Sequence, residues 1–160
     1  MTDFSASVPY LPPSSNKIRT VVRNRIIYTS HANKYRKQFM QFMASNYVVD
    51  LQKFAKECKD DFVATYVIEI TLYFPLAQLI NKGWETGKAQ SYYKTMDLGN
   101  REKLLNDCII KSFGGVFDDN VYFDILLHKR CDDINPRVDF NITKLPSGEM
   151  FGIPVPKRRV

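Results

Sequence analysis

The sequence predicts a single α+β domain over residues 1–160, in which a small mixed β-sheet carries two helices packed on one of its faces. A chain of 160 residues, 44% of them hydrophobic, is long enough for one core and too short for two. Apolar residues alternate with a period of two in several segments and recur with helical spacing in two others. The expected order is strand, hairpin, helix, strand, helix, strand, strand, which is typical of the α+β class.

The N-terminal part is expected to form a strand followed by a basic hairpin. Residues 8–13 are interpreted as a short strand ending in the turn Pro12-Pro13-Ser14-Ser15-Asn16, because proline fixes its backbone angle and donates no hydrogen bond. Residues 17–28 alternate weakly, and Asn24 is a typical turn residue. The sequence therefore predicts a hairpin or ordered loop with four basic residues, Lys17, Arg19, Arg23 and Arg25.

A helix is expected next, with a hydroxyl side chain at its start. Either Thr29 or Ser30 is placed to accept a backbone N–H bond from the first turn. An apolar stripe typical of an amphipathic helix follows, and it consists of Tyr35, Phe39, Phe42 and Met43. This helix, or a broken pair of helices, is expected to continue to about Lys59.

The middle of the chain combines a strand with an irregular segment. Residues 62–74 alternate strictly, with seven apolar residues on one face, and Pro75 ends the strand. Residues 76–94 have no clean period. We expect them to form an irregular insertion with its own aromatic group, Trp84, Tyr92 and Tyr93.

A second helix and two strands complete the expected fold. The helix is predicted over residues 99–112 and ends before Gly114-Gly115, because glycine readily adopts the left-handed conformation past a helix. Its buried side is expected to be Leu104, Leu105, Cys108 and Ile109. Strands are predicted around residues 121–127 and 138–142, and residues 146–160 are expected to be a mobile tail.

Composition indicates a polyanionic partner and no membrane span. Lys and Arg number 23 against 17 Asp and Glu, so the net charge is +6, and basic residues that neutralise phosphates release counterions. No apolar stretch approaches the roughly 20 residues of a membrane helix, and no signal peptide is evident. Three widely spaced cysteines suit a reducing cytoplasm and are expected to be small buried side chains: Cys58, Cys108 and Cys131.

The candidate catalytic residues surround the second helix. Asp97 directly precedes it, and Asn100, Lys103 and Asp107 share one helical face, opposite the leucines. Asp118-Asp119 open the next strand. If helix and strand pack antiparallel, these aspartates and Asp97 are expected to meet at one end of the layer. Carboxylates of this kind hold Mg²⁺, which activates water for phosphodiester hydrolysis, while a lysine neutralises a phosphate oxygen.

A purely structural interpretation of the same residues stays open at this point. Asp97 is also the kind of charge that stabilises a helix N-terminus, and Lys103 with Asp107 has the spacing of an ordinary ion pair. Asp118-Asp119-Asn120 is also a common turn sequence. Spacing alone does not choose between the two interpretations.

Five motifs in order make the chain resemble the RusA-type Holliday-junction resolvases over residues 8–145. That family carries an early PPSxN turn, a basic loop, a Tyr-Arg pair on a helix, a DxDNxxK motif opening a helix, and an Asp-Asp pair before a strand. The corresponding residues are Pro12-Pro13-Ser14-Ser15-Asn16, Arg25-Ile26-Ile27-Tyr28-Thr29-Ser30, Tyr35-Arg36, Asp97 with Asn100 and Lys103, and Asp118-Asp119.

The resemblance implies a Mg²⁺-dependent homodimer, with Mn²⁺ as a second possible metal, that nicks both strands of four-way or branched DNA in the cytoplasm of a bacterial cell or a phage-infected host. It assigns catalysis to Asp97, Asp118, Asp119 and Lys103, with Asp97 and Asp119 as metal ligands. The expected DNA contacts, which position phosphates without reading sequence, are Asn16, Lys17, Arg25, Lys34 and Arg36.

Two departures from the family pattern leave alternatives open. Gly99 stands where a second aspartate is usual, and the possible substitutes are Asp107, Asp118 and Glu102. Asp107 is included among the metal ligands, because it shares a face with Lys103. The alternative is a catalytically weak or inactive junction-binding protein. Residues 76–94 are longer than the family's usual segment, and they are interpreted as a contact for DNA bases or a partner subunit, or as a plain surface loop. A third interpretation is a small basic module that binds RNA or protein.

Overall fold

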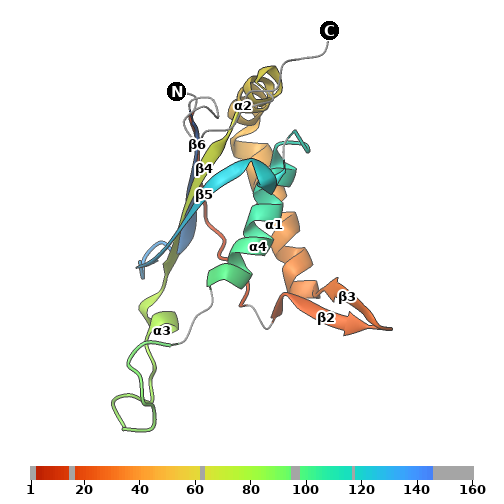
Figure 1. The fold of residues 1–160 in the computed structure, drawn as a ribbon. Helices are drawn as coiled ribbons and strands as arrows, with labels where there is room; N and C mark the ends of the chain where they lie inside the picture. The colour runs from red at the N-terminus through yellow and green to blue at the C-terminus, as the bar shows by residue number, and fades with distance from the viewer. Residues whose placement is uncertain (1–2, 15–16, 62–63, 95–97, 117, 146–160) are drawn as a thin grey trace.

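A mixed four-stranded sheet forms one layer of the molecule (Figure 1). The structure, a computed structural model, describes residues 3–14, 17–61, 64–94, 98–116 and 118–145, without the side chains of Asn100, Asp119 and Phe123. The strand order is β1-β6-β4-β5, and β4 pairs antiparallel with β6 but parallel with β5. The strands are β1 (Asp3–Val8), β4 (Tyr66–Phe74), β5 (Tyr122–Cys131) and β6 (Arg137–Lys144). A separate hairpin consists of β2 (Arg19–Val22) and β3 (Arg25–Tyr28).

The long helices all lie on one side of the sheet (Figure 1). They are α1 (Ser30–Asn46), α2 (Val48–Asp60) and α4 (Leu98–Ser112), and a one-turn helix, α3 (Leu76–Leu79), follows β4. The predicted α+β class with helices on one face is confirmed. The first predicted helix is the broken pair α1 and α2, because Tyr47 leaves the helical conformation between them and its hydroxyl bonds to the backbone of Ser7 in β1.

One hydrophobic core joins the helices to the sheet. In β4 every second residue from Tyr66 to Phe74 is buried, as the strict alternation predicted. Phe4 of β1 is central to an aromatic group, with ring centroids 5.0 Å from Phe113 and 5.8 Å from Phe54. Such edge-to-face and tilted contacts are favourable beyond the apolar area that they bury.

The first strand lies earlier in the chain than the sequence predicted. It spans Asp3–Val8 rather than residues 8–13, and it pairs antiparallel with β6 from Asp3 opposite Thr143 to Val8 opposite Val138. The alternating burial of Phe4, Ala6 and Val8 fits this register. Pro12 and Pro13 lie beyond the strand, since proline cannot donate to a ladder.

The other boundaries differ at β4 and β5. β4 begins at Tyr66, and Phe62, where the strand was predicted to start, lies outside the described residues. Val121 belongs to a 3-10 turn, and a bulge shifts the register after Tyr66 opposite Tyr122. Ile125 stays 45% exposed and Cys131 is also exposed, because β5 is an edge strand with little covering it. The predicted burial of Cys131 was therefore wrong.

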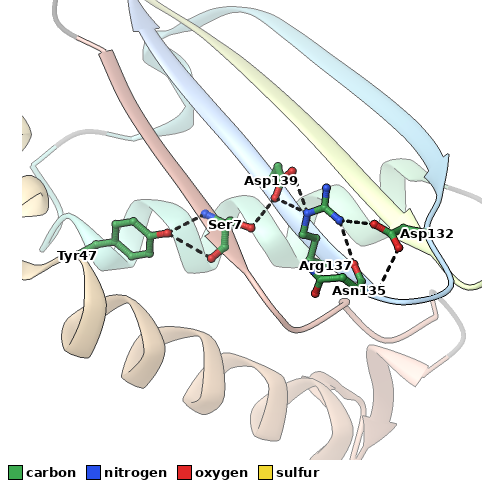
Figure 2. A network of polar contacts seen from close by, with 6 residues as sticks. All are labelled: Ser7, Tyr47, Asp132, Asn135, Arg137 and Asp139. Carbon is green, nitrogen blue, oxygen red and sulfur yellow. Dashed lines mark hydrogen bonds and ion pairs between the residues drawn. The ribbon is translucent and has the colours of Figure 1, made fainter.

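The far face of the sheet is polar and internally bonded (Figure 2). Ser7 Oγ donates to Asp139 at 2.6 Å, and Asp139 accepts a second bond from Arg137 Nε at 3.1 Å. Arg137 also donates to Asp132 at 2.7 Å. Backbone N–H donation from Asn135, followed by the Arg137 contact, lowers the pKa of Asp132. The network links β1, β6 and the β5–β6 turn. The polar side chains on this face are therefore explained by their role in holding the strands together.

Candidate active site and nucleic-acid interface

A buried arginine joins the proline turn to the start of α4. Arg101 is only 9% exposed, and its guanidinium donates to the carbonyl of Pro12 at 2.7 Å. The same group lies over the ring of Phe74, the last residue of β4, at 5.2 Å from the ring centroid. Burial lowers the pKa of Arg101. Three segments distant in sequence therefore meet at one end of the molecule.

Sequence reasoning did not assign a role to Arg101, although a signal was present. The residue lies three, four and seven positions before the buried residues of α4. It therefore falls on the apolar stripe of the helix and not on the polar face. A charged residue at such a position needs a buried partner, and here the partner is a backbone carbonyl.

Tyr28 and Asp107 join the base of the hairpin to α4. The Tyr28 hydroxyl donates to Asp107 Oδ2 at 2.5 Å, and the guanidiniums of Arg36 and Arg19 lie 4.9 and 5.8 Å from the centroid of the Tyr28 ring. Partial burial, and then the bond to Asp107, raises the pKa of Tyr28. Asp107 is half-buried and Lys103, one turn earlier, is exposed. Asp107 thus bonds to Tyr28, and no ion pair joins it to Lys103, although both side chains are described.

The aspartate pair lies at the opposite end of α4. Arg101 of the first turn is beside Phe74 at the end of β4, whereas Tyr122, which follows Asp118-Asp119, pairs with Tyr66 at the start of β4. Nine residues of strand separate these places by roughly 26 Å. Figure 1 shows β5 beginning beside the end of α4. The short glycine turn keeps the start of β5 near the last turn of α4 and away from its first turn. Asp97 itself lies outside the described residues, so its expected meeting with Asp118-Asp119 stays a prediction.

Some predicted site residues fall outside the description. Asp97 and Asn16 lie outside the described residues, and of Asp119 only the backbone, in a 3-10 turn, is described. Asp118 is exposed. Among the residues that the structure describes, no group of three potential metal-binding side chains forms.

The predicted DNA contacts that are described lie just before the hairpin, on it and on the first two turns of α1. Lys17, Arg25 and Lys34 are exposed, and Arg36 is half-buried against Tyr28. Residues 4–49 contain seven lysines and arginines and no aspartate or glutamate. This uninterrupted charge is a further sequence signal, and it favours a polyanion on this surface.

Residues 76–94 form an arm that reaches beyond the sheet (Figure 1). Ile80 and Tyr93 form an isolated bridge across its base. Its aromatic side chains are exposed and contact one another, with ring centroids 6.2 Å apart for Trp84 and Tyr92 and 5.0 Å apart for Tyr92 and Tyr93.

Comparison with known proteins identifies the family. The family model described as Endodeoxyribonuclease RusA matches residues 9–143. A search of curated proteins found no match. None of the helices in the described part of the chain has the length and apolar character needed to cross a bilayer. Nucleases of this family are generally metal-dependent and act on branched DNA. The chain therefore belongs to the RusA endodeoxyribonuclease family of Holliday-junction resolvases.

Proposed function

We propose that the chain is an active, Mg²⁺-dependent resolvase that makes paired nicks in four-way or branched DNA as a homodimer. The contact between Arg101 and Pro12 carries this proposal, because it holds the proline turn, which leads into the basic segment, against the start of α4 and so sets the basic surface beside that helix. The acid-free charge of residues 4–49 attracts phosphates to that surface. The start of α4, which follows Asp97 in the sequence, then faces bound DNA.

The donor chemistry of the candidate ligands fits a hard cation. Asp97, Asp119 and Asp107 offer only carboxylate oxygens, which Mg²⁺ prefers and Mn²⁺ also accepts. When bound, the metal supplies an activated water and stabilises charge on the phosphate. Lys103 is exposed one turn from Asp107 and neutralises a phosphate oxygen, while Asp118 adds charge beside Asp119.

The proposed homodimer brings the two ends of α4 into one site. Asp118-Asp119 and the start of α4 are too far apart to act together in one chain. In such a two-fold dimer, the aspartate pair of each chain would complete the site at the start of α4 in the other chain. Two equivalent sites then serve the two strands of the junction.

A junction-cleavage assay tests the activity. A labelled four-way junction is incubated with the protein in Mg²⁺, in Mn²⁺ and in EDTA. Symmetric nicks in either metal and none in EDTA are expected. Binding without nicking in both metals would mean that Gly99 has left an inactive junction-binding protein. Absence of any binding to DNA would refute the assignment altogether.

Mixing two inactive variants tests the shared site. Asp97→Asn and Asp119→Asn are prepared separately, and each alone is expected to be inactive. In a mixed dimer with shared sites, one site carries both substitutions and the other carries none. Nicking of one strand should therefore reappear on mixing and subunit exchange. If each chain builds its own site, the mixture stays inactive, and the shared site is ruled out.

A further inference from the structure

The hairpin β2–β3 exposes apolar side chains that no other described segment covers. Val21 and Ile26 face each other across the two strands and are 67% and 70% exposed. Val22 and Ile27 are also exposed, at 47% and 44%. A hairpin with bare β-branched residues on both faces is unusual on a solvated surface, since such residues are normally buried.

The base of the hairpin is anchored while its tip projects (Figure 1). Ile18, just before β2, is buried in the core, and Thr29 N donates to the carbonyl of Ile18 at 2.9 Å. Tyr28 bonds to Asp107 of α4. Because paired residues and residues two apart share a face, Val21 and Ile26 extend the face whose base is Tyr28. The exposed apolar pair is thus held in a defined position relative to α4.

Charge at the tip indicates what covers this face. The turn residues Arg23 and Asn24 both have positive φ, of 48° and 59°. Asparagine and glycine favour that conformation and arginine does not, so a basic residue occupies a turn position that disfavours it. Arg25 is exposed beside the turn. Two hairpins packed together would bring these cations against one another, whereas a polyanion neutralises them.

We propose that the hairpin is a wedge for branched DNA, a role that rests on the proposed function for its substrate class. Val21 and Ile26 pack against base pairs that are left without a stacking neighbour where duplex arms meet, and Arg23 and Arg25 contact the flanking phosphates. Inserted apolar side chains are a known way to exploit or create unstacked steps in DNA. Linear duplex offers no such surface, so the wedge provides the preference for branched DNA.

The variant V21S/I26S tests the wedge, because it removes apolar surface and keeps every charge. Binding is measured in EDTA, where no cleavage interferes, to a four-way junction with 2-aminopurine at the branch point and to a duplex of equal length. Junction affinity is expected to fall by about tenfold or more with duplex affinity unchanged. The 2-aminopurine fluorescence change seen with wild type should disappear. Val49→Ser is the matched control, since Val49 is 72% exposed on α2.

The remaining outcomes distinguish failure of the wedge from failure of the proposed function. Unchanged junction preference, or equal loss on junction and duplex, would show that the apolar pair does not read the branch. If the wild type sediments as a dimer and V21S/I26S as a monomer, the hairpin is a subunit contact and not a wedge. Wild type that binds neither DNA would refute the wedge and the proposed function together. Wild type that shows the wedge signal but never nicks in Mg²⁺ would refute only the activity. The single variants V21S and I26S replace the double variant if it fails to fold.

Discussion

At the scale of single residues, the site depends on side chains whose partners are distant in sequence. The motifs located Asp107 and Tyr28, but periodicity does not reveal that they bond to each other across 79 positions. Arg101 was missed because a charged residue next to a polar motif is normally solvated, and only the fold places the carbonyl of Pro12 within its reach. Local patterns therefore identified candidate site residues better than they predicted the contacts between them.

Replacing Arg101 with alanine should destabilise the protein and weaken DNA binding. The change removes the bond to Pro12 and leaves a void beside Phe74. We expect the free energy of unfolding to fall by about 1–3 kcal/mol in urea denaturation. Lys103→Ala, on the exposed face of the same helix, should change stability by less than about 0.5 kcal/mol. Equal stability of wild type and Arg101→Ala would show that the contact contributes nothing.

Replacing Asp107 with asparagine distinguishes a metal ligand from an anchor. If Asp107 replaces the carboxylate missing at Gly99, Asp107→Asn should reduce junction cleavage by more than about a hundredfold. Even the mutation of a residue that only supports a metal ligand reduces activity by up to about that factor. Tyr28→Phe removes the same hydrogen bond but keeps the carboxylate, so its cleavage rate should stay close to wild type. Similar, small effects of the two variants would show that Asp107 only anchors Tyr28 to α4. Asp118 or Glu102 would then be the substitute for the missing carboxylate.

At the scale of elements, the sequence predicted correctly those features that depend on neighbouring residues alone. Thr29 caps α1 through the N–H of Ala32, Gly114 ends α4 with a φ of 69°, and the hairpin turns at Asn24, all as the sequence predicted. Strands were less well predicted because their boundaries depend on partners. β1 is defined by its register with β6, and the bulge in β5 follows from pairing with β4.

The β5–β6 turn should make stability depend on pH through Asp132. Because the pKa of Asp132 is lowered in the folded state, its contribution is complete above the unfolded value of about 3.9 and is lost as pH falls through the folded value. Asp132→Asn should lower Tm at neutral pH, and the difference from wild type should shrink as pH falls below about 4. A constant difference in calorimetry at all pH values would contradict this explanation.

At the scale of the whole molecule, the sequence predicted the class and the family but not the arrangement of the site. The hairpin, the proline turn and the start of α4 lie at one end, and Asp118 lies at the other. No pattern in a single sequence shows which end of a helix a following strand approaches. A site that spans these ends is a property of the assembly, which is why we propose that the homodimer completes it.

The most direct test of the proposed nuclease site measures junction cleavage and junction binding together for Asp97→Asn and Asp119→Asn. Each change keeps the size of the side chain but removes the charge that attracts Mg²⁺. Cleavage should fall by orders of magnitude, while binding in EDTA persists or strengthens because less negative charge repels the phosphates. Cleavage by both variants at the wild-type rate would contradict the assignment of catalysis to these aspartates.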